Sequence, residues 1–194
     1  PKDGYVAGAD INLLKAWNLE TGDESVIVAI TDAGVDYLHE DLAGAMWVNE
    51  AELNGTPGVD DDNNEYVDDV YGYNFAVPDG SNNMIGTIKP EDHGTHVAGT
   101  IAAVNNNGTG ISSIAGGNAS ESGVKIMSCQ IFSGQYAGTV LEEVRAIKYA
   151  ADNGAVILQC SWGYISGAAN PYEWTPQFST DEEWEYYNVL ERKA

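Results

Sequence analysis

Basic residues are scarce in this chain, whose 194 residues include 8 Lys and Arg against 30 Asp and Glu, a formal net charge of −22. Non-specific nucleic-acid binding depends on Lys and Arg that neutralise phosphates, so we expect no nucleic-acid partner. The same imbalance argues against docking on an anionic membrane surface. It favours solubility, tolerance of salt, or bound cations.

Long apolar runs and cysteines are also scarce. No run of about 18 apolar residues occurs, so we expect no membrane span. Two cysteines, Cys129 and Cys160, are too few for a disulfide framework. Both stand in apolar runs, and we interpret them as buried thiols rather than as a bridge. The chain starts at Pro1 without a basic and then apolar leader, which indicates a mature or excised segment.

Apolar and helical segments alternate along the chain. We expect helices at 10–19, 93–104 and 139–153, and strands at 25–31, 123–132 and 155–161. Strands separated by helices predict an α/β fold with a mainly parallel sheet covered on both faces. With 43% hydrophobic residues, residues 1–194 can form one domain with its own core.

A last helix is expected after residue 180, capped by Thr180 and Glu183. A parallel α/β sheet normally returns to a strand after a helix. No strand follows this one, so we expect the sheet to be incomplete in this chain.

Polar residues stand where the expected elements begin or end. Asp32 follows the first strand, His93 opens a helix, and Ser161 ends the last strand. The carboxyl ends of parallel strands are where such folds place their sites. An Asp that orients a His, and a His that takes a proton, are what a serine nucleophile requires. From spacing alone, a capping Asp and a structural His remain open alternatives.

The sequence motifs around these residues are more specific than their spacing. They read ITDAGVDYLHEDL around Asp32, HGTHVAGTIAAVNNN from His93, and VILQCSWG up to Gly163. These words resemble the Asp, His and substrate-edge motifs of the subtilisin-like serine proteases, the subtilases, in that family's order. The resemblance covers about residues 10–163. It implies a three-layer subtilisin-like fold in which Asp32 and His93 match two triad members, with a carboxylate oxygen within hydrogen-bond reach of the imidazole.

The resemblance also implies two backbone segments that bind the substrate. Ser161, Trp162 and Gly163 match the segment that pairs with the substrate and walls the pocket next to the scissile bond. Residues upstream of that bond would add as a strand to the other segment, which matches Ser133, Gly134 and Gln135. The implied function is that of a secreted or cell-surface endopeptidase that acts on peptides or proteins.

The chain departs from the family pattern in four places. Ala33 stands where a Thr or Ser is usual, and Gln159 where an Asn is usual. Neither the G-T-S word of the nucleophile nor the word of the oxyanion Asn occurs in these residues. We expect both in a C-terminal part of the same catalytic domain, which would be a partner of this chain, and we expect the chain alone to be inactive. The alternatives are an inactive pseudoprotease or peptide-binding module with the same fold, and a calcium-binding interaction domain.

Two acid-containing segments are candidate calcium sites. In the first, GVDDDNNEYVDDVYG, the spacing predicts that calcium binds oxygens of five residues: Asp60, Asp62, Asn64, the Tyr66 carbonyl and Asp68. The alternative for this segment is a solvated acidic loop. For the second site, the family resemblance implies Asp41, the Asn106 side chain, and the carbonyls of Val104, Thr109 and Ile111. The spacing of His93 and His96 could suit zinc, but the protease resemblance already explains both residues, and His39 is interpreted as structural.

Overall fold

The computed structural model describes residues 6, 8–76, 86–118, 120–134, 136, 138–163, 182, 185, 186, 189 and 193. Thr180 and Glu183, the expected caps of a last helix, lie outside the described residues, as does Gln135. In the described part of the chain, no helix combines the length and hydrophobicity needed to cross a bilayer.

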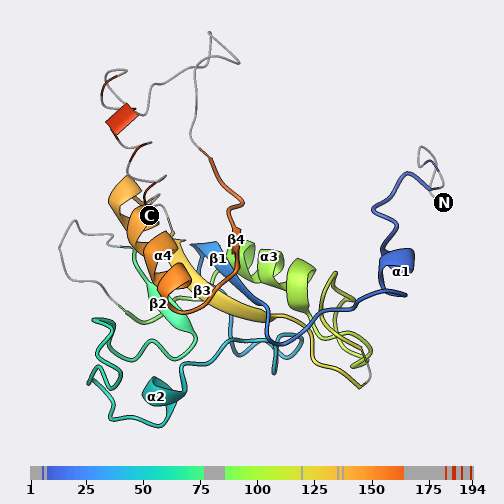
Figure 1. Ribbon diagram of the computed structural model, residues 1–194, viewed down its shortest axis with the longest axis horizontal. Helices are drawn as coiled ribbons and strands as arrows, with labels where there is room; N and C mark the ends of the chain where they lie inside the picture. The colour runs from blue at the N-terminus through green and yellow to red at the C-terminus, as the bar shows by residue number, and fades with distance from the viewer. Residues whose placement is uncertain are drawn as a thin grey trace.

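Four parallel strands form one sheet at the centre of the molecule (Figure 1). Their spatial order is β2 (Gly72–Asn74), β3 (Lys125–Phe132), β1 (Ile27–Ala33) and β4 (Ile157–Gln159). The three expected strands are thus present with shifted ends. Strand β2 was not predicted, because three residues are too few to show an alternating pattern.

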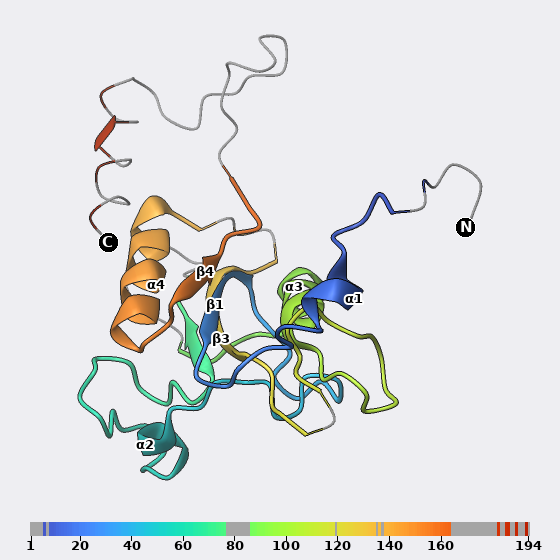
Figure 2. The ribbon, with the colours of Figure 1, turned by 45° about the vertical axis from the view of Figure 1, so that its right-hand side comes forward.

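Two longer helices cover opposite faces of this sheet (Figure 2). Helix α3 (Asp92–Ala102) packs with Val28, Ile30 and Ile126, and helix α4 (Val140–Asp152) packs with Ala29 and Met127. Neighbouring residues of a strand point to opposite faces, so the continuous apolar run of β1 supplies both cores. The predicted three-layer α/β architecture is confirmed.

Two further helices are single turns, α1 (Leu13–Ala16) and α2 (Glu50–Leu53). The helix expected over 10–19 is therefore much shorter, and its N-cap is Asn12 rather than Asp10. No residue of α1 is buried, and an isolated helical segment this short is marginal without tertiary packing.

Strand β4 forms one edge of the described sheet. Ile157 and Leu158 of this strand are exposed, and so are Val156 before it and Cys160 after it. The expectation of two buried thiols was therefore wrong for Cys160. Cys129 lies in central strand β3, where burial raises the pKa of its thiol; both cysteines are free.

Helix α3 lies unusually close to the end of β1. A Cβ atom added to Gly94 would sit 2.0 Å from the Ala33 carbonyl oxygen, whereas one added to Gly99 would meet nothing nearer than 3.9 Å, at Ile111. The glycine that follows His93 therefore permits the approach of helix and strand.

These two glycines provide a matched pair of substitutions in one helix. We expect Gly94→Ala to lower the free energy of unfolding by about 1–3 kcal/mol, because helix and strand must move apart. Gly99→Ala should be neutral or stabilising by up to about 1 kcal/mol, through helix propensity. Urea unfolding followed by circular dichroism measures both. Equal stabilities of the two variants would contradict close packing at Gly94.

Candidate active site

Asp32 stands at the carboxyl end of β1 with its side chain 1% exposed. The ladder between β1 and β3 shifts register between Asp32 and Ala33, because Ile131 is an extra residue of β3. The Ala33 N–H donates to Oδ1 of Asp32 at 2.6 Å. The carboxylate is thus held by rigid backbone at an irregular strand end, where bulges commonly direct functional side chains.

His93 lies in the first turn of α3 and reaches this carboxylate. Its Nδ1 is 2.6 Å from Oδ1 of Asp32, which agrees with the proximity expected from the sequence. The imidazole side chain is 64% exposed, so one ring nitrogen is bound to a buried acid while the ring faces outward. With Asp32 ionised, Nδ1 carries the proton and Nε2 is left to accept one.

The second carboxylate oxygen of Asp32 lacks a donor. Oδ2 is buried and has no hydrogen-bond partner among the described residues. Ala33, which offers no hydroxyl, follows directly. A buried acceptor without a donor is uncommon, because its desolvation is not offset by a hydrogen bond. This oxygen is therefore an unusual feature of the site.

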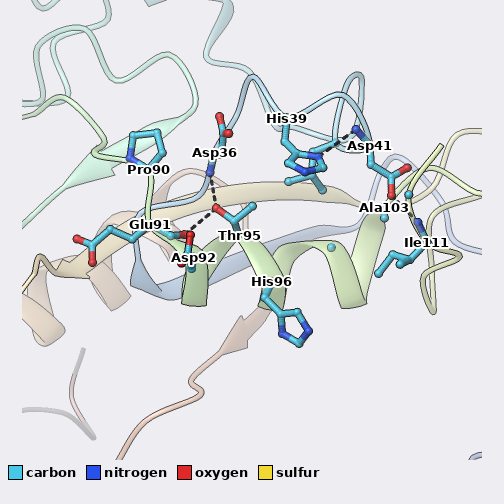
Figure 3. A pocket seen from close by; sticks show the side chains of 13 residues that line it. Asp36, His39, Asp41, Pro90, Glu91, Asp92, Thr95, His96, Ala103 and Ile111 are labelled. Carbon is cyan, nitrogen blue, oxygen red and sulfur yellow. Dashed lines mark hydrogen bonds between the residues drawn. The ribbon is translucent and has the colours of Figure 1, made fainter.

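Short polar contacts fix the helix start against the strand end. The Thr95 hydroxyl donates to the Glu91 carbonyl at 2.8 Å and accepts the Asp36 N–H at 2.9 Å (Figure 3). Buried Gln130 of β3 accepts the Lys89 N–H at 2.8 Å with Oε1. These bonds join three separate segments around the Asp32–His93 pair.

A cavity of ≈ 620 Å³ lies beside α3 and is lined by both acids and histidines (Figure 3). His39 and Asp41 lie together on one side of the helix, whereas His96 extends from the other (Figure 3). His39 Nδ1 accepts the Asp41 N–H at 3.1 Å. Within the described ranges, no histidine belongs to a cluster with metal-ligand spacing.

The segment after β4 contacts strand β1, while its expected role in substrate binding stays a prediction. The Trp162 indole N–H donates to the Thr31 carbonyl at 2.6 Å, and its ring packs edge-on against Phe132. Ser161 Oγ accepts a bond from the Gln159 amide, and Gly163 follows. Trp162 therefore contacts the strand that carries Asp32.

The other expected substrate segment folds on itself. Ser133 and Tyr136 exchange backbone hydrogen bonds of 3.1 and 2.9 Å, and the Gly134 N–H donates to Glu91 Oε1 at 3.0 Å. The N–H groups of Ser133 and Gly134 are thus already engaged within the protein. Gln135, the third residue of this expected segment, lies outside the described residues.

The acidic loop gathers carboxylates that differ from the set predicted by spacing. Oxygens of Glu52, Asp62 and Asp69 lie within 4.8 Å of one another, and Glu52 and Asp69 are buried. Burial raises the pKa of Asp69, although Tyr149, Asn64 and Asn49 donate to it.

The residues predicted from spacing only partly converge in this loop. Asp60 and Asp62 both accept the Asn64 N–H, and Asn64 Oδ1 accepts the Tyr66 N–H. Asp68 is directed elsewhere, because its carboxylate accepts the Gly58 N–H. The cluster of carboxylates that could hold a cation is therefore formed by Glu52, Asp62 and Asp69.

The loop after α3 meets Asp41 as expected, but through different atoms. Asn107, rather than Asn106, donates to Asp41 Oδ1 at 2.8 Å. Ile111 donates its N–H to Oδ2, and Val104 donates its N–H to the Asp41 carbonyl. N–H groups do not ligate a cation, and the Thr109 N–H likewise turns inward to Asn107 Oδ1. Both carboxylate oxygens of Asp41 accept hydrogen bonds from this loop, and calcium binding through Asn106 and the carbonyls of Val104, Thr109 and Ile111 stays a prediction.

Sequence reasoning missed several residues of these sites. Gln130 had a detectable signal, since it is a large polar residue among the apolar residues of strand β3. Glu52 and Glu91 had none, because they accept hydrogen bonds from Asp68 and Gly134, which lie 16 and 43 residues away in the chain.

The chain is similar to known proteins over most of its length. The model of the subtilase family matches residues 23–188. Subtilisin-like protease 1 of Plasmodium berghei (strain Anka) is 34% identical over 141 residues, 73% of this chain and 22% of its own. The halolysin-like extracellular serine protease Nep of Natrialba magadii is 31% identical over 157 residues, 81% of this chain and 24% of its own. The chain thus spans about a quarter of these relatives.

Solved structures show the same fold. The prenylagaramide maturation protease PagA superimposes with a TM-score of 0.54 at 22% sequence identity. The match covers 95% of this chain and 48% of PagA. The family model matches most of the chain, which therefore belongs to the subtilase family of subtilisin-like serine proteases.

Proposed function

We propose that this chain carries the Asp–His part of the active site of a secreted or cell-surface serine endopeptidase. The observation that supports this most directly is the 2.6 Å contact between His93 Nδ1 and buried Asp32 Oδ1. Its partners would be a peptide or protein substrate and a further C-terminal part of the same catalytic domain, which supplies the serine. The extracellular assignment of the relative from Natrialba magadii supports secretion.

The proposed mechanism follows from which imidazole nitrogen is engaged. Nε2 of His93 takes the proton of the serine hydroxyl as its oxygen attacks the scissile carbonyl. Asp32 holds the Nδ1 tautomer and stabilises the imidazolium that forms. His93 then returns the proton to the leaving amine, and the same cycle activates water for hydrolysis of the acyl-enzyme.

An inactive, peptide-binding protein with the same fold is the second candidate. The unpartnered Oδ2 of Asp32 favours it, because Ala33 cannot supply the hydroxyl that the family usually has next to the triad acid.

Activity separates the two candidates. The 194-residue chain should neither cleave peptides nor react with a fluorophosphonate probe, because it lacks the serine and the oxyanion Asn. A longer form that includes a G-T-S word should do both. In it, Asp32→Asn should lower kcat by about 10⁴-fold, the scale of loss for triad aspartates in serine proteases.

The controls for this experiment are direct. His96→Ala, on the opposite side of α3 from His39 and Asp41, should fold and retain cleavage far better than His93→Ala. A longer protein that folds, contains the serine and still fails to cleave a broad peptide library supports the peptide-binding alternative. A reaction of the short chain with the probe would mean that another serine is the nucleophile.

We further propose that calcium stabilises this chain at the acidic loop. Three carboxylates, from Glu52, Asp62 and Asp69, lie within 4.8 Å, and two of them are buried. Close carboxylates repel one another, and a bound divalent cation offsets that repulsion while contributing no catalytic chemistry. The loop after α3 that bonds to Asp41 is a second candidate. A cation could bind there only if the Asn107 and Ile111 N–H groups no longer donate to the Asp41 carboxylate.

Thermal unfolding in excess chelator and then in millimolar calcium tests this proposal. Calcium at about 100 times its dissociation constant should stabilise the protein by about 2.7 kcal/mol, seen as a higher Tm. Asp62→Asn should remove most of this response, and Asp41→Asn reports on the second loop. Glu24→Gln, an exposed acid outside both loops, removes one charge and should keep the response. A Tm that does not depend on calcium would leave the loop as a solvated acidic surface.

A further inference from the structure

The turn at residues 133–136 is compact and closed on itself. Ser133 and Tyr136 donate to each other's carbonyl groups, and Gly134 adopts a φ of 58° that favours glycine. The turn follows β3, whose neighbour β1 carries Asp32. Its position relative to Asp32 and His93 is set by its continuity with β3 and by the side chains that bond to it from other elements.

Two glutamates attach this turn to the two helices that cover the sheet. Glu91 Oε1 accepts the Gly134 N–H at 3.0 Å, across 43 residues of sequence. Glu142 Oε1, in the first turn of α4, accepts the Tyr136 hydroxyl at 2.6 Å. Hydrogen bonds to a carboxylate are stronger than those between neutral groups, so the two acids are effective attachments.

Glu91 also occupies a special position in the chain. It is the N-cap residue of α3, two residues before His93, yet its side chain makes no capping hydrogen bond to that helix. Its own N–H donates to the Gly34 carbonyl at 2.8 Å. In Figure 3 its carboxylate extends away from His39 and Asp41. One residue thus joins the chain just after Asp32, the start of the His93 helix, and the turn.

We propose that Glu91 is a positioning residue that fixes the turn at residues 133–136 relative to the Asp32–His93 pair. The inference rests on the proposed function in one respect, that the turn lies where upstream substrate residues bind. Without the carboxylate, the Gly134 N–H loses its acceptor, and the turn loses its hydrogen bond to the residue that begins α3. The loss should therefore weaken the binding of substrate residues that contact this turn.

The first test needs no catalysis and uses the 194-residue chain. Amide exchange at Gly134, followed by NMR, should become about tenfold faster in Glu91→Ala, the effect of losing a hydrogen bond to a charged group. Glu91→Gln retains an acceptor oxygen of the same reach and should restore most of the protection. Asp92→Asn removes a neighbouring charge and should leave Gly134 unchanged. Should Glu91→Ala not fold, Glu91→Asp keeps the charge but shortens the side chain, and it should also speed exchange.

The second test uses a longer, active form of the protein. Glu91→Ala should raise KM about tenfold for peptides that extend several residues upstream of the scissile bond, and much less for a single-residue ester. Glu91→Gln should restore KM.

The outcomes are distinct. Unchanged exchange at Gly134 in Glu91→Ala or Glu91→Asp overturns the proposal, and so does faster exchange with an unchanged KM for extended peptides. A longer wild-type protein without cleavage overturns the proposed function instead. The exchange measurement still decides whether Glu91 holds the turn.

Discussion

The close approach of helix α3 to the end of strand β1 is the constraint on which the site depends. Only a glycine fits at position 94, because a Cβ atom would lie 2.0 Å from the Ala33 carbonyl. This approach brings the exposed imidazole of His93 onto a carboxylate that is otherwise buried. It also brings the Glu91 N–H to Gly34. A small separation of helix and strand would break both contacts at once, since hydrogen bonds weaken steeply with distance.

Buried polar groups at the carboxyl edge of the sheet make this geometry specific. Gln130 has both ends of its amide engaged, with Lys89 and Phe132. Asp32 is the exception, because only one of its oxygens has donors among the described residues. Fully paired polar groups define one conformation, whereas an unpaired one costs free energy. The site thus combines a well-determined frame with one uncompensated oxygen beside Ala33.

The positions of the acidic residues show what local spacing in the sequence cannot predict. The alternation of acids at residues 60–68 indicated a cation loop, and Asp62 does belong to the carboxylate cluster. Its companions Glu52 and Asp69 come from α2 and from the approach to β2. A spacing rule compares neighbours in one segment, but ligands converge only when separate segments pack together. Asn106 was expected beside Asp41 from the family resemblance, and in the structure the neighbouring Asn107 donates to Asp41 instead.

The sequence by itself determined the α/β class, the positions of the longer elements, and the identity of Asp32 and His93 as a candidate pair. It could do so because continuous apolar strands, a helical period and the words around these residues are local patterns. Tertiary structure alone decided that Glu91 accepts the Gly134 N–H, that Asp32 Oδ2 finds no donor among the described residues, and that Cys160 is exposed. Each of these depends on which distant segment lies against the residue. Packing determines that through the summed burial of many side chains, so no single stretch of sequence encodes it.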